Sequence, residues 1–363
     1  MSSDREAAKA EFLANAGLAA APREPLAGDA STRRYERLRP RGGSSLIFMD
    51  QPPAVESAPC PPDATPRQRI AAGYNACARL AAGRVEAFVT TAGYLRGRGL
   101  SAPEVIAFDA GQGLAVLEDL GDDLYARLIE GGSDEAPLYD AAIDALVKLH
   151  AEDAPADLTS DGLTWPLLTY DDLALKTADE LIAEWWPKFA GGQPVSPDDL
   201  AEWDALWAPI RARGEAGAAV FCHRDYHAEN LIWLPGRAGP GRVGMLDFQD
   251  AVRAHPAWDL SMLLHDARRE VSPERERAAL ERYLRARPEL DRETFLSDYR
   301  ALGALNIVRI LGLFARLVTR DGKPRYRTFM PWLWAYLDRC LADPDLAGLK
   351  RWLDRHAPVE RRA

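Results

Sequence analysis

Residues 222–234 read CHRDYHAENLIWL, a polar loop followed by an apolar run. The loop carries the pattern H-R-D-x-x-x-x-N, which is formed by His223, Arg224, Asp225 and Asn230. A second apolar run, VGMLDF at 243–248, follows the turn PGRAGPGR and contains Asp247. This order predicts a hairpin that brings the ends of the two segments together. The alternative interpretation is a structural histidine and a capping aspartate before an ordinary strand.

Three of these side chains have the chemistry that phosphoryl transfer requires. The reaction needs a carboxylate that orients the attacking hydroxyl, and metal ligands that neutralise phosphate charge. Asp225 is the predicted catalytic carboxylate, while Asn230 and Asp247 offer the hard oxygen atoms that Mg²⁺ prefers. The complete pattern, in its context of loop, strand, turn and strand, favours a phosphotransferase over the structural alternative.

Composition sets limits on the remaining classes. The chain has 363 residues with 47% hydrophobic and 28% charged residues, which suits two domains with a sizeable core. Its net charge of −10 argues against a nucleic-acid partner. Four scattered cysteines without a C-x-x-C pair predict reduced thiols and a cytoplasmic protein. No unbroken apolar run of about 18 residues occurs, so no membrane span is predicted. The sequence leaves the oligomeric state unknown.

The pattern along the chain predicts an α+β fold. A helix is expected at 4–16, and a helical region with breaks at Gly73, Gly83 and Gly93 is expected at 67–97. The expected strands lie at 35–38, 44–50, 105–108 and 114–117. Residues 122–215 and everything after Pro256 read as helical, apart from loops. The predicted architecture is a small mixed α/β N-lobe at 1–117, a hinge at 118–121 and a large helical C-lobe at 122–363.

The segment after Asp247 narrows the acceptor class. Protein kinases carry a long activation segment that ends in A-P-E and forms a platform for a peptide. Here Asp259, in or at the start of a helix, follows only 12 residues after Asp247. This spacing favours a small-molecule acceptor. A hydrolase is disfavoured because no G-x-S-x-G pattern occurs.

These motifs resemble the aminoglycoside phosphotransferase superfamily, which has a bilobal protein-kinase-like fold. HRDYHAEN, LDFQDA and VLEDLGDDLY carry the resemblance. Three further segments, GDASTRRYERL, IFMDQPP and LGLFARLVTRDGKPRYRTFMPWLWAYL, are similar to the bacterial anomeric kinases of cell-wall sugar recycling. Those kinases phosphorylate N-acetylmuramate and N-acetylglucosamine at C1. The similarity covers nearly the whole chain, and the part at 54–82 looks like an insertion.

The resemblance implies roles for individual residues. Asp225 would be the catalytic base, and Asn230 and Asp247 would hold Mg²⁺ with ATP. Asp259 would be a structural anchor under the catalytic loop. The backbone of the hinge would meet adenine, and its residues are Glu118, Asp119 and Leu120.

The lysine that usually holds ATP phosphates on a strand is missing, because no lysine occurs between Lys9 and Lys148. One interpretation is a degraded kinase that binds without turnover. The favoured interpretation is that Arg33 and Arg34 supply the charge, since arginine suits bidentate phosphate contacts. The turn before them, with Ser31 and Thr32, could cradle phosphate with backbone N–H groups. The bland alternative for each arginine is a solvated surface charge.

Two acceptor classes remain open. Aminoglycosides are polycations, whereas N-acetylmuramate carries a lactyl carboxylate. Segment 305–330 has six basic residues against Asp321, which favours an anionic sugar, although a solvated basic face is the common explanation. Tryptophans could stack on a sugar, and the candidates are Trp165, Trp185, Trp186, Trp332 and Trp334. Further substrate-binding candidates are Tyr170, Asp171, His227 and Asp250.

Overall fold

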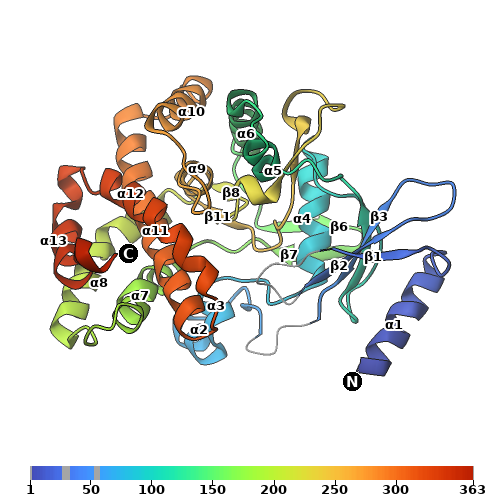
Figure 1. Cartoon of the computed structure of the whole chain (residues 1–363), viewed down its shortest axis with the longest axis horizontal. Helices are drawn as coiled ribbons and strands as arrows, with labels where there is room; N and C mark the ends of the chain where they lie inside the picture. Colours follow the sequence, from blue (N-terminus) through green and yellow to red (C-terminus); the bar gives the residue numbers. More distant parts are fainter. Residues whose placement is uncertain (1, 27–32, 53–57, 363) are drawn as a thin grey trace. The chain divides into compact units, whose positions relative to one another are not determined.

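The computed structural model describes residues 2–26, 33–52 and 58–362. The chain divides into two compact units, each assembled from three separate stretches (Figure 1). The first unit comprises Met1–Gly132, Pro155–Leu167 and Asn230–Asp250. The second comprises Ser133–Ala154, Leu168–Glu229 and Ala251–Ala363. The lobes predicted at 1–117 and 122–363 are continuous in sequence, and as a functional division they stay a prediction.

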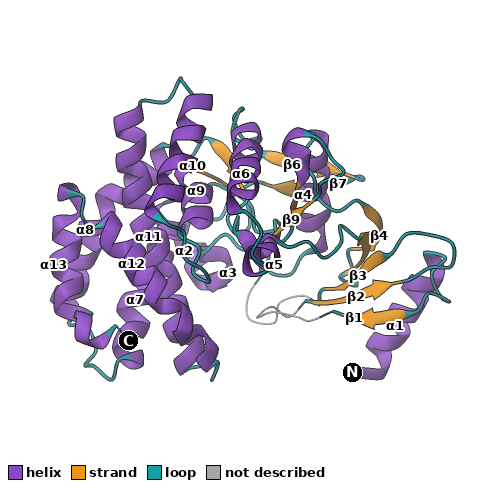
Figure 2. Cartoon of the chain, turned by 45° about the horizontal axis from the view of Figure 1, so that its top comes forward, coloured by secondary structure: helices purple, strands orange, loops and turns teal. Residues whose placement is uncertain are grey.

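An antiparallel sheet of five strands forms the centre of the first unit, in the order β1-β2-β3-β5-β4. The strands are β1 (Arg23–Pro25), β2 (Arg34–Leu38), β3 (Leu46–Asp50), β4 (Val105–Asp109) and β5 (Leu114–Glu118). Figure 2 shows these strands with helix α1 (Ser2–Asn15) beside them. The four strands expected from the sequence and the N-terminal helix are therefore confirmed, with shifts of one or two residues at their ends.

The two faces of this sheet differ because side chains alternate along each strand. One face packs on α1 and forms a hydrophobic core of Phe12, Leu13, Leu38, Phe48, Leu114 and Val116. Asp50 lies on the same face, buried, where Lys9 and Arg5 of α1 form ion pairs with its carboxylate. The opposite face carries Tyr35 and Met49, and Met49 is fully buried.

The helical region expected at 67–97 contains α2 (Pro66–Ala72), α3 (Tyr74–Cys77) and α4 (Val85–Gly97). Gly73 and Gly83 break it as predicted, and both have positive φ angles of 99° and 76°. The predicted break at Gly93 is wrong, because α4 continues through it. Gly93 is needed for packing instead: a Cβ there would lie 2.2 Å from the hydroxyl oxygen of Ser160.

Ser160 belongs to a β-hairpin that the sequence analysis assigned to a helical region. Strands β6 (Asp157–Ser160) and β7 (Leu163–Pro166) pair antiparallel across the two-residue turn Asp161-Gly162. Both turn residues have positive φ, at 51° and 76°. Such a turn matches the twist of paired strands, and Asp-Gly is its usual sequence. The signal for this hairpin was therefore present in the sequence.

A second short hairpin carries the motif region of the first unit. Helix α5 (Tyr125–Glu130) follows the five-stranded sheet in the sequence. Much later in the chain, the 3-10 turn Ala228–Asn230 leads into β9 (Leu231–Trp233). Strand β9 pairs with β10 (Val243–Met245) across a second 3-10 turn at Gly239–Arg242. The hairpin predicted from the two apolar runs is confirmed.

The second unit is mainly helical and contains one short pair of strands, β8 (Val220–Cys222) with β11 (Val252–Ala254). The helices begin at polar N-caps such as Asp171, Ser196, Ser272 and Asp291, whose side chains accept backbone hydrogen bonds. They are α6 (Glu135–Leu149), α7 (Asp172–Phe189), α8 (Pro197–Ala216), α9 (Ala257–Leu264), α10 (Pro273–Ala286), α11 (Arg292–Thr319), α12 (Met330–Cys340) and α13 (Ala347–His356).

Helix α11 is the central helix of this unit and lies against α7, α9 and α12 (Figure 1). It approaches α7 closely, since a Cβ at Gly312 would lie 2.3 Å from the backbone carbon of Leu181. Within the described residues it is the one helix long and apolar enough to cross a membrane, with a mean hydropathy of 1.7, but 78% of that stretch is buried. Burial against neighbouring helices accounts for this apolar character.

Candidate active site

The H-R-D segment follows β8 and is held by an aspartate from α9. The Asp259 carboxylate accepts hydrogen bonds from the backbone N–H groups of His223, at 2.7 Å, and Arg224, at 2.8 Å. Arg224 has a φ of 78°, a strained conformation for a residue with a side chain. Two charge-assisted hydrogen bonds offset that strain and fix the backbone that leads into Asp225. Asp259 therefore acts as the anchor that the resemblance implied.

A buried histidine lies behind this anchor. His150 Nε2 is 3.6 Å from Asp259, and its Nδ1 is 2.9 Å from the Tyr283 hydroxyl. Burial lowers the pKa of His150 and raises the pKa of the neighbouring Cys222 thiol, so both groups favour their neutral forms. Although His150, Cys222 and Asp259 lie close enough to share a metal ion, the Asp259 carboxylate already binds two backbone N–H groups. The cluster fits a hydrogen-bonded support for the loop.

The two predicted metal ligands lie at one end of the β9–β10 hairpin, in the first unit. The backbone N–H of Leu246 donates to the carbonyl oxygen of Asn230 at 2.9 Å, which brings Asp247 next to Asn230. Asp247 has a φ of 61°, the second strained position among the motif residues. Phe248, which follows, is fully buried and packs on Phe88 with ring centroids 4.7 Å apart. The hairpin thus brings the backbone at Asn230 close to the backbone at Asp247.

Arg33 supplies positive charge at this position in the same unit. Its guanidinium forms an ion pair with the Asp247 carboxylate and donates to Gln249 Oε1 at 2.8 Å. A third contact, at 3.2 Å, joins it to the hydroxyl of Tyr35. Burial alone would lower the pKa of Arg33, but the Asp247 carboxylate raises it. Arg33 is therefore a fixed cation beside a predicted metal ligand. A cation at this position could hold ATP phosphates in place of the missing strand lysine.

Sheet register separates the two candidate arginines. Arg34 pairs with Asp50 in the ladder, so it lies on the α1 face of the sheet, and its side chain is exposed. Ser31 and Thr32 lie outside the described residues. Arg33 is thus the member of the predicted phosphate-binding group that the structure brings to Asp247.

Gln249 is a site residue whose role the sequence analysis missed. It replaces the glycine of D-F-G, and its amide group both accepts from Arg33 and donates to Asp247 Oδ1 at 3.1 Å. The side chain therefore bridges the cation and the carboxylate. The signal in the sequence was the glutamine that directly follows Asp247 and Phe248.

The predicted hinge has tightly paired side chains. Glu118 forms ion pairs with Arg96 and Arg237, and its backbone N–H donates to Glu104. Asp119 pairs with Arg37 at 2.7 Å and accepts from the backbone N–H of Gly121. Burial would raise the pKa of Asp119, but hydrogen bonds from Ser45 and Arg37 lower it. With the side chains occupied by these partners, contact of Glu118, Asp119 and Leu120 with adenine would use their backbone groups, and it stays a prediction.

The remaining substrate candidates have structural contacts of their own. Tyr170 is buried, and its ring lies 4.9 Å from the Arg224 guanidinium and 4.8 Å from the Trp258 ring. Asp171 caps α7, and Asp250 accepts from the backbone N–H of Ala81 at 2.6 Å. The backbone N–H of His227 donates to the carbonyl oxygen of Asp225. These contacts place Tyr170 and His227 beside the loop, and substrate binding by the four residues stays a prediction.

The tryptophans considered for sugar stacking include both buried and exposed side chains. Trp186 and Trp334 pack edge to face at 4.9 Å in the core of the second unit, whereas Trp332 is 37% exposed. A role in sugar stacking therefore suits Trp332 better than the two buried rings.

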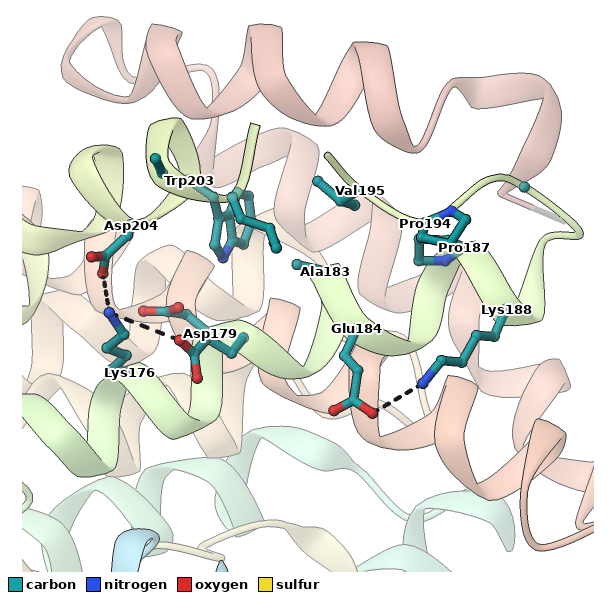
Figure 3. Close-up of a pocket in the computed structure, with 14 residues that line it drawn as sticks. Lys176, Asp179, Ala183, Glu184, Pro187, Lys188, Pro194, Val195, Trp203 and Asp204 are labelled. Atoms are coloured by element: carbon teal, nitrogen blue, oxygen red, sulfur yellow. Dashed lines mark hydrogen bonds and ion pairs between the residues drawn. The ribbon is translucent and has the colours of Figure 1, made fainter. Parts of the chain in front are cut away.

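A pocket of about 600 Å³ lies between α7 and α8 in the second unit (Figure 3). Its charged lining is paired internally, since Lys176 contacts Asp204 at 2.8 Å and Lys188 contacts Glu184 at 3.0 Å. Buried Asp179 lines it and pairs with Arg211 at 2.9 Å. None of the residues proposed for catalysis or for metal, nucleotide or sugar binding lines this pocket. It is a feature separate from the candidate active site.

Comparison with solved structures identifies the fold. The ADP-bound aminoglycoside phosphotransferase APH(2'')-Ib matches with a TM-score of 0.52 at 14% identity, over 91% of this chain and 96% of that one. The choline kinase LicA from Streptococcus pneumoniae matches with a TM-score of 0.51 at 14% identity, over 94% and 99%. The predicted protein-kinase-like fold, with an antiparallel-sheet N-lobe and a helical C-lobe, is confirmed.

Comparison with curated sequences gives much higher similarity. An N-acetylmuramate/N-acetylglucosamine kinase from Caulobacter vibrioides is 70% identical over 100% of this chain and 99% of its own length. A protein of the same description from Pseudomonas aeruginosa is 30% identical over 90% of this chain and 86% of its own length. Residues 22–296 match the phosphotransferase enzyme family. The chain therefore belongs to the phosphotransferase enzyme family, as a phosphotransferase with a hydroxyl acceptor.

Proposed function

We propose that this chain is an ATP- and Mg²⁺-dependent kinase that phosphorylates the anomeric C1 hydroxyl of N-acetylmuramate and N-acetylglucosamine in peptidoglycan recycling. The observation that carries the proposal is the 70% identity, over the full chain, to a curated N-acetylmuramate/N-acetylglucosamine kinase. The set of aspartate, asparagine and aspartate at 225, 230 and 247 supports turnover rather than binding alone. The proposal places the protein in the cytoplasm, with an amino sugar as its small-molecule partner.

In the proposed reaction, Asp225 accepts the proton of the C1 hydroxyl as the sugar oxygen attacks the γ-phosphorus of ATP. The bond between that phosphorus and the bridging oxygen breaks, so the products are a sugar 1-phosphate and ADP. The strained backbone at Arg224 and the Asp259 anchor fix the position of Asp225 before substrate arrives. Holding the base in place in advance avoids reorganisation during the reaction.

Asn230 and Asp247 would hold Mg²⁺. Amide and carboxylate oxygens are the donors that this ion prefers. The backbone hydrogen bond between Leu246 and Asn230 keeps the two predicted ligand residues adjacent in the fold. When bound, the ion supplies charge neutralisation for the phosphates. Arg33 would add a second positive charge by exchanging its contact with Asp247 for phosphate oxygens. Gln249, which touches both groups, would guide that exchange.

The test is a coupled ADP-release assay with Mg-ATP against N-acetylmuramate, N-acetylglucosamine and kanamycin, followed by phosphorus NMR of the product. We expect ADP release with both sugars and a sugar 1-phosphate signal. Asp225→Asn should lower kcat by about three orders of magnitude, because loss of a base and its positioning is worth factors of that size. Exposed Asp198 on α8 offers a matched control, and Asp198→Asn should leave kcat unchanged.

Other outcomes would redirect the proposal. ADP release with kanamycin alone would identify an aminoglycoside-modifying enzyme. ATP binding without turnover on any acceptor would identify a binding protein of the same fold. Normal turnover in the Asp225→Asn variant would show that the base is another residue.

A further inference from the structure

The two sugars of the proposed function differ at one position, and the present inference rests on that function. N-acetylmuramate carries a lactyl ether with a carboxylate at C3, whereas N-acetylglucosamine has a neutral hydroxyl there. An enzyme that accepts both must accommodate the anionic group without requiring it. A cation near the catalytic loop that is not already paired with a carboxylate would meet that condition.

Arg309 on α11 has this character. It is half-buried, and its guanidinium lies 5.7 Å from the centre of the Trp258 ring. Its Nε donates to Asn306 Oδ1 at 3.0 Å, and one terminal nitrogen lies 3.5 Å from Met262 Sδ. All three partners are uncharged. No carboxylate among residues 2–26, 33–52 and 58–362 forms an ion pair with it.

Three other arginines in the same unit, whose side chains are at most 9% exposed, are neutralised by carboxylates. Arg211 pairs with three aspartates, Arg269 with Glu229 and Asp266, and Arg362 with Asp338 and Asp354. Removing a guanidinium from water is costly unless an anion compensates it. Arg309 carries this cost with neutral partners, so an anionic ligand would gain more from it than from an arginine that already has a carboxylate.

Its neighbours connect Arg309 to the catalytic loop within the second unit. The Trp258 ring under Arg309 packs edge to face on Tyr170 at 4.8 Å, and Tyr170 in turn lies 4.9 Å from the Arg224 guanidinium. Trp258 also directly precedes Asp259, the anchor of that loop. Arg309 is therefore three packed contacts from the residue that precedes Asp225.

The other basic residues near Arg309 in sequence do not share this position. Arg320 pairs with exposed Asp321 at the end of α11. Arg325 lies over its neighbour Tyr326, and Arg327 lies over Phe189. Within segment 305–330, Arg309 is therefore the arginine that packs on Trp258, whereas Arg320, Arg325 and Arg327 contact other partners.

We propose that Arg309 binds the lactyl carboxylate of N-acetylmuramate and so determines how well the enzyme uses this sugar relative to N-acetylglucosamine. Arginine suits the task because its planar fork can donate two hydrogen bonds to one carboxylate. The contact adds affinity for the anionic sugar only, since the neutral sugar has no group for it.

The experiment measures kcat/KM for both sugars in the wild type, Arg309→Gln, Arg309→Lys and Arg320→Gln. For Arg309→Gln we expect a fall of about ten- to one-hundred-fold with N-acetylmuramate, the range for loss of a charged hydrogen bond, and less than about two-fold with N-acetylglucosamine. Arg309→Lys should recover part of the loss. Arg320→Gln removes one charge from the same segment and should leave both values unchanged.

The two sugars are controls for each other, because a misfolded variant loses both. An equal fall with both sugars in Arg309→Gln and Arg309→Lys would show that Arg309 supports packing and would overturn the inference. Unchanged kinetics with N-acetylmuramate would overturn it as well, by showing that another group binds the carboxylate. Failure of the wild type with both sugars would instead refute the proposed function, so the two failures are distinguishable.

Discussion

Arg33 is the side chain that we propose as the main contact to the ATP phosphates. Its guanidinium is held between Asp247 and Gln249 in the first unit, at the site proposed for phosphate and metal. Arg33→Ala should raise the KM for ATP by about ten- to one-hundred-fold, because it removes a charged contact to phosphate. Arg33→Lys should retain part of the affinity as a point charge.

The matched control is Arg39, an exposed arginine just after β2 that pairs with Glu24. Initial rates at varied ATP concentration should be unchanged in Arg39→Ala. An unaltered KM in Arg33→Ala would mean that the phosphate charge comes from another group.

The sequence offered Arg33 and Arg34 as candidate substitutes for a strand lysine, but it could not choose between them. The choice depends on strand register, because a shift of one residue moves a side chain to the opposite face. Gln249 shows a second limit. Its hydrogen bonds to Arg33 and Asp247 span 216 and 2 residues, and the first of these contacts depends on the folded chain. The motif aspartates and asparagine were predictable because their spacing is local.

Asp179 should give the protein a distinctive dependence of stability on pH. Burial raises its pKa to about 7 against the lowering effect of Arg211, whereas an unfolded aspartate titrates near about 3.9. Between these two pH values the folded state holds a proton on Asp179 that the unfolded state has lost. The unfolding free energy of the wild type therefore falls as pH rises through that window. Asp179→Asn cannot titrate, so its unfolding free energy minus that of the wild type should increase from about pH 5 to 8.

Urea denaturation at several pH values measures this difference. Asp198→Asn removes an exposed carboxylate from neighbouring α8 and should give a difference that changes much less with pH. A flat difference for Asp179→Asn would show that Arg211 keeps Asp179 charged throughout the range.

Helix α4 and the β6–β7 hairpin form an element pair that tests the packing argument. Gly93 faces Ser160, and an added Cβ would lie 2.2 Å from its hydroxyl oxygen. Gly93→Ala should therefore destabilise the protein by about 1–3 kcal/mol, the usual cost of overpacking. Gly97, at the end of the same helix, has nothing within 4 Å of an added Cβ.

Gly97→Ala is thus a matched control that should be neutral or stabilising, by up to about 1 kcal/mol, because alanine is the better helix former. Adding Ser160→Gly to Gly93→Ala should recover part of the loss. Thermal denaturation distinguishes the cases, and equal effects of the two alanine substitutions would contradict the packing argument.

This element pair also explains why sequence analysis failed there. Glycine lowers helix propensity, so a break at Gly93 was the local expectation, but close packing of Ser160 selects glycine for its lack of a side chain. The hairpin was missed because 122–215 was treated as one helical region, although Asp161-Gly162 marks a tight turn. Strands β2, β3, β4 and β5 were found because their apolar runs are bounded by turn residues.

For the chain as a whole, the sequence predicted a sheet-containing part and a helical part. It did not predict which stretches of the chain belong to each part. Two hairpins, β6–β7 and β9–β10, follow the predicted hinge at 118–121 yet belong to the first unit. Assignment by continuous stretches could not anticipate this, since it depends on long-range packing. One consequence is that the proposed metal ligands Asn230 and Asp247 belong to the first unit and Asp225 to the second.

The proposed roles of these residues predict that nucleotide binding and catalysis can be separated by mutation. A ligand that binds only the folded state raises its stability by RT ln(1 + [L]/Kd), so thermal shift reports nucleotide binding without turnover. Asp225→Asn should keep the full shift given by Mg-ATP in the wild type, because Asn230, Asp247 and Arg33 are intact. Asp247→Asn should lose the part of the shift that requires Mg²⁺, and Arg33→Ala should show a smaller shift both with and without the ion.

The comparison needs equal concentrations of ATP with Mg²⁺ and with a chelator, since the shift depends on ligand concentration. If Asp225→Asn lost the shift as completely as Asp247→Asn, the base would also be part of the nucleotide site and the two functions would not be separable. If Asp247→Asn kept its Mg²⁺-dependent shift, Asn230 alone could not explain it, and a carboxylate outside the motif would have to be the second ligand. A shift lost only in Arg33→Ala would make that arginine, rather than the ion, the main determinant of nucleotide affinity.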